Sequence, residues 1–182
     1  RLLEVNPKSP EGLAQLASVY AAERNFAEAE ALLRQRVADA PDDLVASGRL
    51  VETLLAQQKT SEAEKEARRM AALESQAGVG AFTLGGAMLS KGDYAAAAEA
   101  FRRSNAARAD DPLPLEALAK SLEAAGKTGE AVALLKGELD DEQNQLLARF
   151  LLGGIYGRQG DKASAEQYCE DVVKAKPDAV LG

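Results

Sequence analysis

Apolar positions along the chain recur with the spacing of a helix face and never alternate as they do in a strand. Leu16, Ala17 and Tyr20 are one, three and four residues apart, which places them on one face of a 3.6-residue helix. The pattern returns along the whole chain and predicts five helix pairs. The first helices of these pairs are expected over residues 10–23, 43–57, 78–91, 112–125 and 144–158. The second helices are expected over residues 26–39, 60–74, 94–108, 128–139 and 162–175.

The pattern repeats every 34 residues without insertion or deletion. One column holds alanine in every copy: Ala29, Ala63, Ala97, Ala131 and Ala165. Thirteen residues earlier, a second column holds leucine in every copy: Leu16, Leu50, Leu84, Leu118 and Leu152. Agreement across independent columns predicts five tandem copies of one helix–turn–helix unit.

The residues between the helices carry start and stop signals. A column five residues before the alanine holds Gly92, Gly126 and Gly160, which are suited to ending the first helix, and Arg24 and Gln58 in the other two copies. We expect caps from Asp93 and Asp161 at second helices and from Ser9 and Asp111, each followed by proline, at first helices.

These columns resemble the tetratricopeptide repeat, whose pattern reads W-x2-L-G-x2-Y, then A-x3-F, then P. The last copy is the closest to it, with Leu152, Gly153, Tyr156, Ala165 and Pro177. The resemblance implies an all-α fold, a right-handed α-solenoid of stacked antiparallel helix pairs. It also implies that the first helices line a concave groove that binds a peptide or a partner protein.

The repeat phase predicts the domain organisation. The five repeats are expected at 10–43, 44–77, 78–111, 112–145 and 146–179. Residues 1–9 fit the end of a second helix from a preceding repeat, and residues 180–182 fit the start of a following one. Apolar residues stand at both ends where a solenoid needs a polar cap, so we expect a segment of a longer array that can associate end to end. The alternative is a pair of natural termini folded back on the outer helix pairs.

Composition removes several classes of activity. The 182 residues contain no histidine and one cysteine, which excludes histidine-dependent triads, histidine metal ligands and an internal disulfide. A net charge of −7 disfavours nucleic-acid binding, and no apolar run approaches the roughly 20 residues of a membrane span. The alanine- and arginine-rich composition is typical of bacteria with GC-rich genomes, and the single unpaired cysteine fits either the cytoplasm or the periplasm.

Each candidate for catalysis or cofactor binding in the sequence has a structural explanation that is favoured over a chemical role. Cys169 stands in the column of Leu33 and Phe101 and is expected to be a buried apolar filler. The acidic groups at 110–111 and 140–142 precede helices, where capping is favoured over calcium binding. The glycine-rich stretch 78–86 lacks the Lys-Ser/Thr of a phosphate loop and falls on a helix. We expect neither an enzyme nor a cofactor or metal site.

Function is therefore expected on the groove surface. The predicted partner-binding residues are Arg49, Glu52, Leu55, Phe82, Gly86, Leu89, Glu116, Lys120, Phe150, Gly154 and Arg158. By column, Phe82 and Phe150 are expected to be exposed beside small residues as apolar anchors, or else to pack between neighbouring first helices. Arg49, Lys120 and Arg158 would complement an acidic segment. The lysine and asparagine clamp of chaperone-adaptor members is absent, because its columns hold Ala14 and Ser18, Gly48 and Glu52, and Phe82 and Gly86.

Three functions remain open at this point. The first is a protein-interaction scaffold, the second is a self-assembly module, and the third is a region of a larger enzyme or of a secretion or exopolysaccharide-assembly protein. The junction of the second and third copies has two glycines at a helix start and is expected to be the least stable part of the array.

Overall fold

The computed structural model describes residues 10–73 and 77–175, which form ten helices and no strand. The first helices of the pairs are α1 (Pro10–Ala22), α3 (Leu44–Ala56), α5 (Ala77–Ser90), α7 (Pro112–Ala124) and α9 (Gln145–Gln159). The second helices are α2 (Phe26–Asp39), α4 (Thr60–Ala71), α6 (Tyr94–Ala107), α8 (Thr128–Gly137) and α10 (Lys162–Ala175). Every helix begins and ends within three residues of its predicted bounds.

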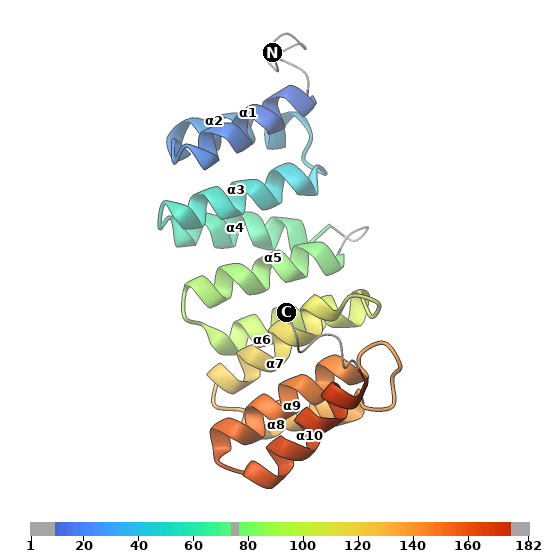
Figure 1. Cartoon of the computed structure of the whole chain (residues 1–182). Helices are drawn as coiled ribbons and strands as arrows, with labels where there is room; N and C mark the ends of the chain where they lie inside the picture. The colour runs from blue at the N-terminus through green and yellow to red at the C-terminus, as the bar shows by residue number, and fades with distance from the viewer. Residues whose placement is uncertain (1–9, 74–76, 176–182) are drawn as a thin grey trace. The chain divides into compact units, whose positions relative to one another are not determined.

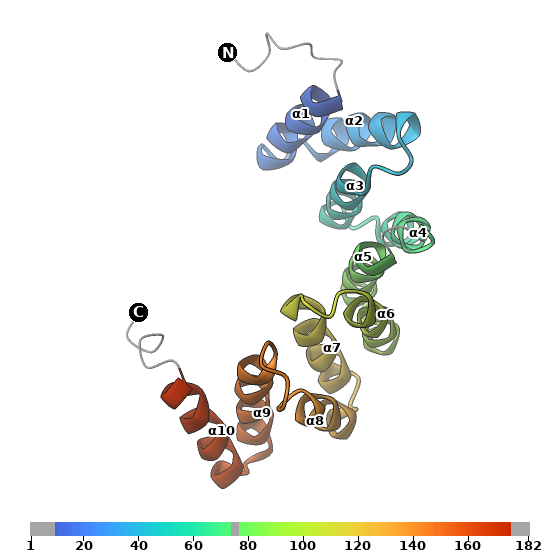
Figure 2. The same cartoon turned by 90° about the vertical axis from the view of Figure 1, so that its right-hand side faces the viewer.

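The helices form two compact units, Arg1–Ala107 and Arg108–Gly182. In the first unit each helix packs on the next, from α1 through α6, and α3 also packs on α5 (Figure 1). Figure 2 shows α1, α3 and α5 along one side of this unit and α2 and α4 along the other. The second unit repeats the arrangement with α7 to α10, in which α7 also packs on α9. The predicted fold class, an all-α solenoid of stacked helix pairs, is confirmed.

The repeated columns form the core of each unit. The alanine column is completely buried at Ala29, Ala63, Ala97 and Ala131, where the second helix crosses its partner. The leucine column is buried at Leu50, Leu84, Leu118 and Leu152. A side chain larger than alanine at the crossing would overpack the contact, which costs about 1–3 kcal/mol.

The turns within the pairs share one backbone conformation. Gly92, Gly126 and Gly160 have φ of 76°, 76° and 81°. The two non-glycine residues of the same column, Arg24 and Gln58, are also left-handed, with φ of 63° and 61°. The column is thus set by the turn geometry, and three copies hold the residue that adopts it without a Cβ penalty.

We predict that Arg24→Gly and Gln58→Gly each stabilise the first unit by about 0.5–1 kcal/mol. Both side chains are exposed, and the left-handed conformation costs an L-residue roughly 1–2 kcal/mol. Glycine avoids this cost, but part of the gain is lost because glycine makes the unfolded chain more flexible. Urea unfolding followed by circular dichroism measures the change. Gly126→Ala is the reverse control in the second unit and should destabilise by a similar amount.

The predicted caps form wherever they lie in the described residues. The Asp111 carboxylate accepts the Leu113 N–H at 3.0 Å, and the Asp93 carboxylate accepts the Ala96 N–H at 3.0 Å. The Asp161 carboxylate accepts the Ser164 N–H at 3.1 Å and the Ser164 hydroxyl at 2.7 Å. The hydrogen bond from the hydroxyl, and after it the one from the N–H, lowers the pKa of Asp161. The predicted cap at Ser9 lies outside the described residues.

One core prediction is wrong, and two others stay open. Cys169 is exposed, and so far as the structure describes α10 this helix has no buried residue. The reason is that no described helix follows α10 to cover this column. The repeat boundaries remain a prediction, and the segments 1–9 and 180–182 lie outside the described residues. The junction expected to be least stable includes residues 74–76, which also lie outside them.

Candidate functional site

A cavity of about 320 Å³ lies between α1 and α3 in the first unit. We name it the α1–α3 pocket, and its lining residues are Ala17, Ser18, Ala21, Phe26, Leu33, Arg49, Glu52, Thr53 and Ala56. The alanines at one face of each first helix leave this space because their side chains stop at Cβ. Two of the predicted partner-binding residues, Arg49 and Glu52, lie in this lining.

A second cavity, of about 260 Å³, lies between α7 and α9 in the second unit. We name it the α7–α9 pocket, and its lining residues are Ala119, Lys120, Glu123, Phe150, Leu151, Gly153, Gly154, Ile155, Arg158 and Cys169. Four of these were predicted from sequence, namely Lys120, Phe150, Gly154 and Arg158. Phe150 is 62 % exposed, so a phenyl ring stands in solvent beside a largely apolar cavity.

Exposed large apolar side chains concentrate on the first helices. In the described part of the chain, six of the eight such residues lie there: Val19, Val45, Val79, Leu89, Leu113 and Phe150. The other two are Tyr94 on α6 and Val173 on α10. Single apolar residues scattered over a surface are normal in proteins. Apolar residues gathered on one set of helices are instead typical of a binding surface.

The three predicted cations are already engaged. Lys120 Nζ lies 2.5 Å from Glu116 Oε1, and Arg158 Nη2 lies 2.7 Å from Glu123 Oε2. Arg49 Nη1 donates to the Ala14 carbonyl oxygen at 3.0 Å and to the Ser18 hydroxyl. Lys120 and Arg158 therefore offer little net charge to an acidic ligand, whereas Arg49 is held by uncharged acceptors alone.

For Phe82 the sequence left two alternatives, an exposed anchor or packing between neighbouring first helices. The ring is half-buried and packs edge-on against Phe101 of α6, with the centroids 5.3 Å apart. Phe82 thus packs within its own helix pair and contributes to the core. Phe150, by contrast, is exposed as its column predicts.

The other predicted residues occupy intermediate positions on the same surface. Leu55 and Glu116 are half-buried, and Leu89 is 38 % exposed. A Cβ added at Gly86 would meet nothing within 4 Å, so the surface beside it is open. At Gly154 a Cβ would lie 3.3 Å from Arg158 Nη1, so the arginine folds over the space that this glycine leaves.

Several residues that line the pockets lie outside the predicted partner-binding set, among them Glu123 and Phe26. Glu123 faces the groove by its column, and it holds Arg158 of the neighbouring first helix, 35 residues away. Phe26 lines the α1–α3 pocket, but its column holds unrelated residues in the other copies, so no periodic signal marks it.

No metal or membrane feature appears in the described residues. Within residues 10–73 and 77–175 no three potential metal ligands of the His, Cys, Asp and Glu types gather at one place. None of the described helices combines the length and apolar character of a membrane span.

Comparison with known structures gives the same fold at low sequence identity. MamA matches with a TM-score of 0.70 and 14 % identity, over 91 % of this chain and 97 % of that one. PilF of Pseudomonas aeruginosa matches with 0.67 and 19 %, over 97 % and 80 % of the two chains. YrrB, described as a tetratricopeptide repeat protein with an unusual peptide-binding site, matches with 0.63 and 14 %, over 98 % and 92 %. A comparison with curated proteins finds no match.

Family models agree with the repeat columns. Two models of the tetratricopeptide repeat match the sequence, one over residues 13–45 and the other over residues 116–180. These matches fall in both structural units, and their helices bury column residues at Ala29, Leu118, Ala131 and Leu152. Its 34-residue period, its helix pairs and these model matches show that the chain belongs to the tetratricopeptide repeat family.

Proposed function

We propose that the chain is a non-catalytic scaffold that binds a peptide or partner segment on the surface of its first helices. The observation that carries the proposal is the concentration of exposed large apolar residues on these helices. In the first unit, α5 carries no charged residue at all, although its surface includes the exposed Val79 and Leu89. An apolar surface of this kind favours a ligand that buries apolar side chains.

The proposal assigns different roles to the two units. In the second unit, Phe150 is the central anchor, flanked by Gly154 and by the ion pairs of Lys120 and Arg158. In the first unit, Leu55, Leu89 and the open surface at Gly86 provide apolar contact, while Arg49 and Glu52 provide polar contact. YrrB, a structural neighbour with a peptide-binding site on the same fold, supports binding of a peptide by this architecture.

A peptide selection tests the proposal. Peptides selected from a random 12-residue library on the intact chain are measured against Phe150→Ala and against Tyr94→Ala, the matched control on a second helix. Phe150→Ala should weaken binding about tenfold or more, because a central aromatic anchor contributes roughly 1–2 kcal/mol or more. Tyr94→Ala should leave the affinity unchanged.

Two results would contradict the scaffold proposal. Peptides that bind equally to the parent chain and to Phe150→Ala would place the site elsewhere. Self-association that raises the molar mass with concentration, and that competes with peptide binding, would instead favour self-assembly through this surface. Light scattering over the concentration range of the binding assay measures that mass.

A further inference from the structure

The α1–α3 pocket has an apolar wall and one charged group with no partner among the described residues. Ala17, Ala21 and Ala56 line it from α1 and α3. Glu52 is exposed at its edge and makes no hydrogen bond or ion pair with any described residue. A pocket with an apolar wall and an unpaired carboxylate in its lining matches a side chain with an aliphatic stem and a cationic head.

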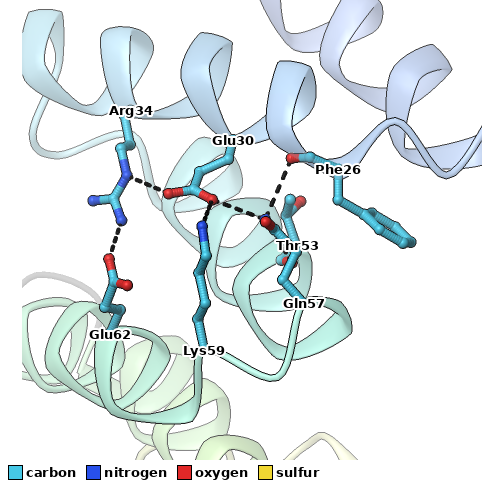
Figure 3. Close-up of polar contacts among 7 residues, drawn as sticks. All are labelled: Phe26, Glu30, Arg34, Thr53, Gln57, Lys59 and Glu62. Atoms are coloured by element: carbon cyan, nitrogen blue, oxygen red, sulfur yellow. Dashed lines mark hydrogen bonds and ion pairs between the residues drawn. The ribbon is translucent and has the colours of Figure 1, made fainter.

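Phe26, in the same lining, adds a feature that favours a cation. Figure 3 shows its ring turned away from the polar groups behind it. The aromatic face attracts a cation through its quadrupole, most strongly where water is displaced. Glu52 and Phe26 thus offer two attractive partners in one cavity.

The ends of two helices meet at the same place. Helix α1 ends at Ala22, just before Phe26, and Gln57 at the end of α3 donates its side-chain N–H to the Phe26 carbonyl oxygen at 3.3 Å. The C-termini of α1 and α3 therefore both lie beside Phe26. The C-terminal end of a helix dipole carries partial negative charge and stabilises a nearby cation, although the positive N-terminal end of α2, which begins at Phe26, offsets part of this effect.

Arg49 also lines the pocket, and its positive charge is directed to α1. Its Nη1 donates to the Ala14 carbonyl oxygen and to the Ser18 hydroxyl, both on α1. Arg49 lies one helical turn before Glu52, on the side of α3 away from its C-terminus.

We propose that the α1–α3 pocket is a binding site for the side chain of a lysine or arginine presented by a partner protein. The aliphatic stem lies along the alanines, and the cationic group lies between the Glu52 carboxylate and the Phe26 ring. This inference rests on the proposed function and reverses the charge of the ligand expected from sequence in the first unit. The partner segment at this pocket is basic.

The test uses three acetylated and amidated pentapeptides in nuclear magnetic resonance titrations of the intact chain. The lysine probe is Ala-Ser-Lys-Ser-Ala, and norleucine or glutamate replaces the lysine in the other two. The lysine probe should shift the amide signals of Ala17, Ala21 and Ala56 saturably, with a Kd about fivefold lower than that of the norleucine probe. The glutamate probe should bind most weakly.

Two variants distinguish binding at this pocket from attraction by the overall negative charge of the chain. Glu52→Gln should remove the preference for lysine over norleucine. Glu28→Gln changes the net charge equally at an exposed position of α2 and should preserve the preference. Equal affinity of the lysine and norleucine probes, a preference that survives Glu52→Gln, or no saturable shift with the lysine probe would overturn the inference. Such a result leaves the scaffold proposal standing if selected peptides still depend on Phe150, so the two can fail separately.

Discussion

Replacing Gly80 with alanine is expected to lower the free energy of unfolding of the first unit by about 3 kcal/mol. A Cβ at this position would lie 2.4 Å from the carbonyl carbon of Met70 and 2.5 Å from the amide nitrogen of Ala71. Both atoms belong to the backbone at the end of α4, so no side-chain rotation relieves the clash. Either α4 and α5 separate or the end of α4 unwinds, and each response loses buried contact around Met70, which is 0 % exposed.

Gly86→Ala on the same helix is the matched control. A Cβ there would meet nothing within 4 Å, and alanine is a better helix former than glycine by roughly 1 kcal/mol. We therefore expect Gly86→Ala to be neutral or to stabilise by up to about 1 kcal/mol, as measured by urea unfolding followed by circular dichroism. Equal losses from the two variants would show that glycine flexibility, and not the close approach of α4 to α5, sets the stability of this helix pair.

The core of both units could be predicted from the sequence because one geometric requirement recurs. Each second helix crosses its partner at a distance that admits only alanine, and this requirement returns every 34 residues at Ala29, Ala63, Ala97 and Ala131. A requirement repeated in register is visible in the sequence as a column. The left-handed turn is visible for the same reason, even where Arg24 and Gln58 replace glycine.

The chemistry of the candidate site was less predictable because it depends on pairings that do not repeat. Lys120 pairs with Glu116 of its own helix and Arg158 with Glu123 of the neighbouring helix. Arg49 instead donates to the uncharged acceptors of Ala14 and Ser18. A residue's column predicts that its side chain faces the groove. It does not predict which neighbouring side chain or carbonyl group that side chain contacts. The packing of Phe82 on Phe101 is of the same kind, since only copy three has phenylalanine in both columns.

A polar cluster between the first two helix pairs leads to the second large effect. Glu30 on α2 is 9 % exposed and accepts hydrogen bonds from Lys59 Nζ at 2.7 Å, Arg34 Nε at 2.8 Å and Gln57 Nε2 at 2.8 Å (Figure 3). Arg34 reaches on to Glu62 of α4. Lys59 and Gln57 lie between α3 and α4, so one carboxylate ties the first helix pair to the second.

The hydrogen bond from Lys59 is the main reason why the pKa of Glu30 falls from 4.5 to about 2, with further lowering by Arg34 and Gln57 against the opposing effect of burial. Because the folded state holds the carboxylate in its charged form, its contribution to stability is complete above about pH 4.5 and is lost as the pH falls towards 2. The lowered pKa corresponds to roughly 3 kcal/mol. We expect about 2 kcal/mol, since Lys59 and Arg34 are 40 % and 46 % exposed and water screens them.

Glu30→Gln should therefore destabilise the first unit by about 2 kcal/mol at pH 7, and the difference from the parent chain should fall to about half or less near pH 3. Urea unfolding of both proteins across this pH range measures the difference, in which all other carboxylates cancel. Glu99→Gln is the control, because Glu99 and Arg102 form a pair 64 % and 47 % exposed, whose loss should cost less than about 0.5 kcal/mol at any pH. A Glu30→Gln deficit that stays constant from pH 7 to pH 3 would mean that the shape of the Glu30 side chain stabilises this junction, whereas a deficit that closes on acidification identifies its charge as the link between the two helix pairs.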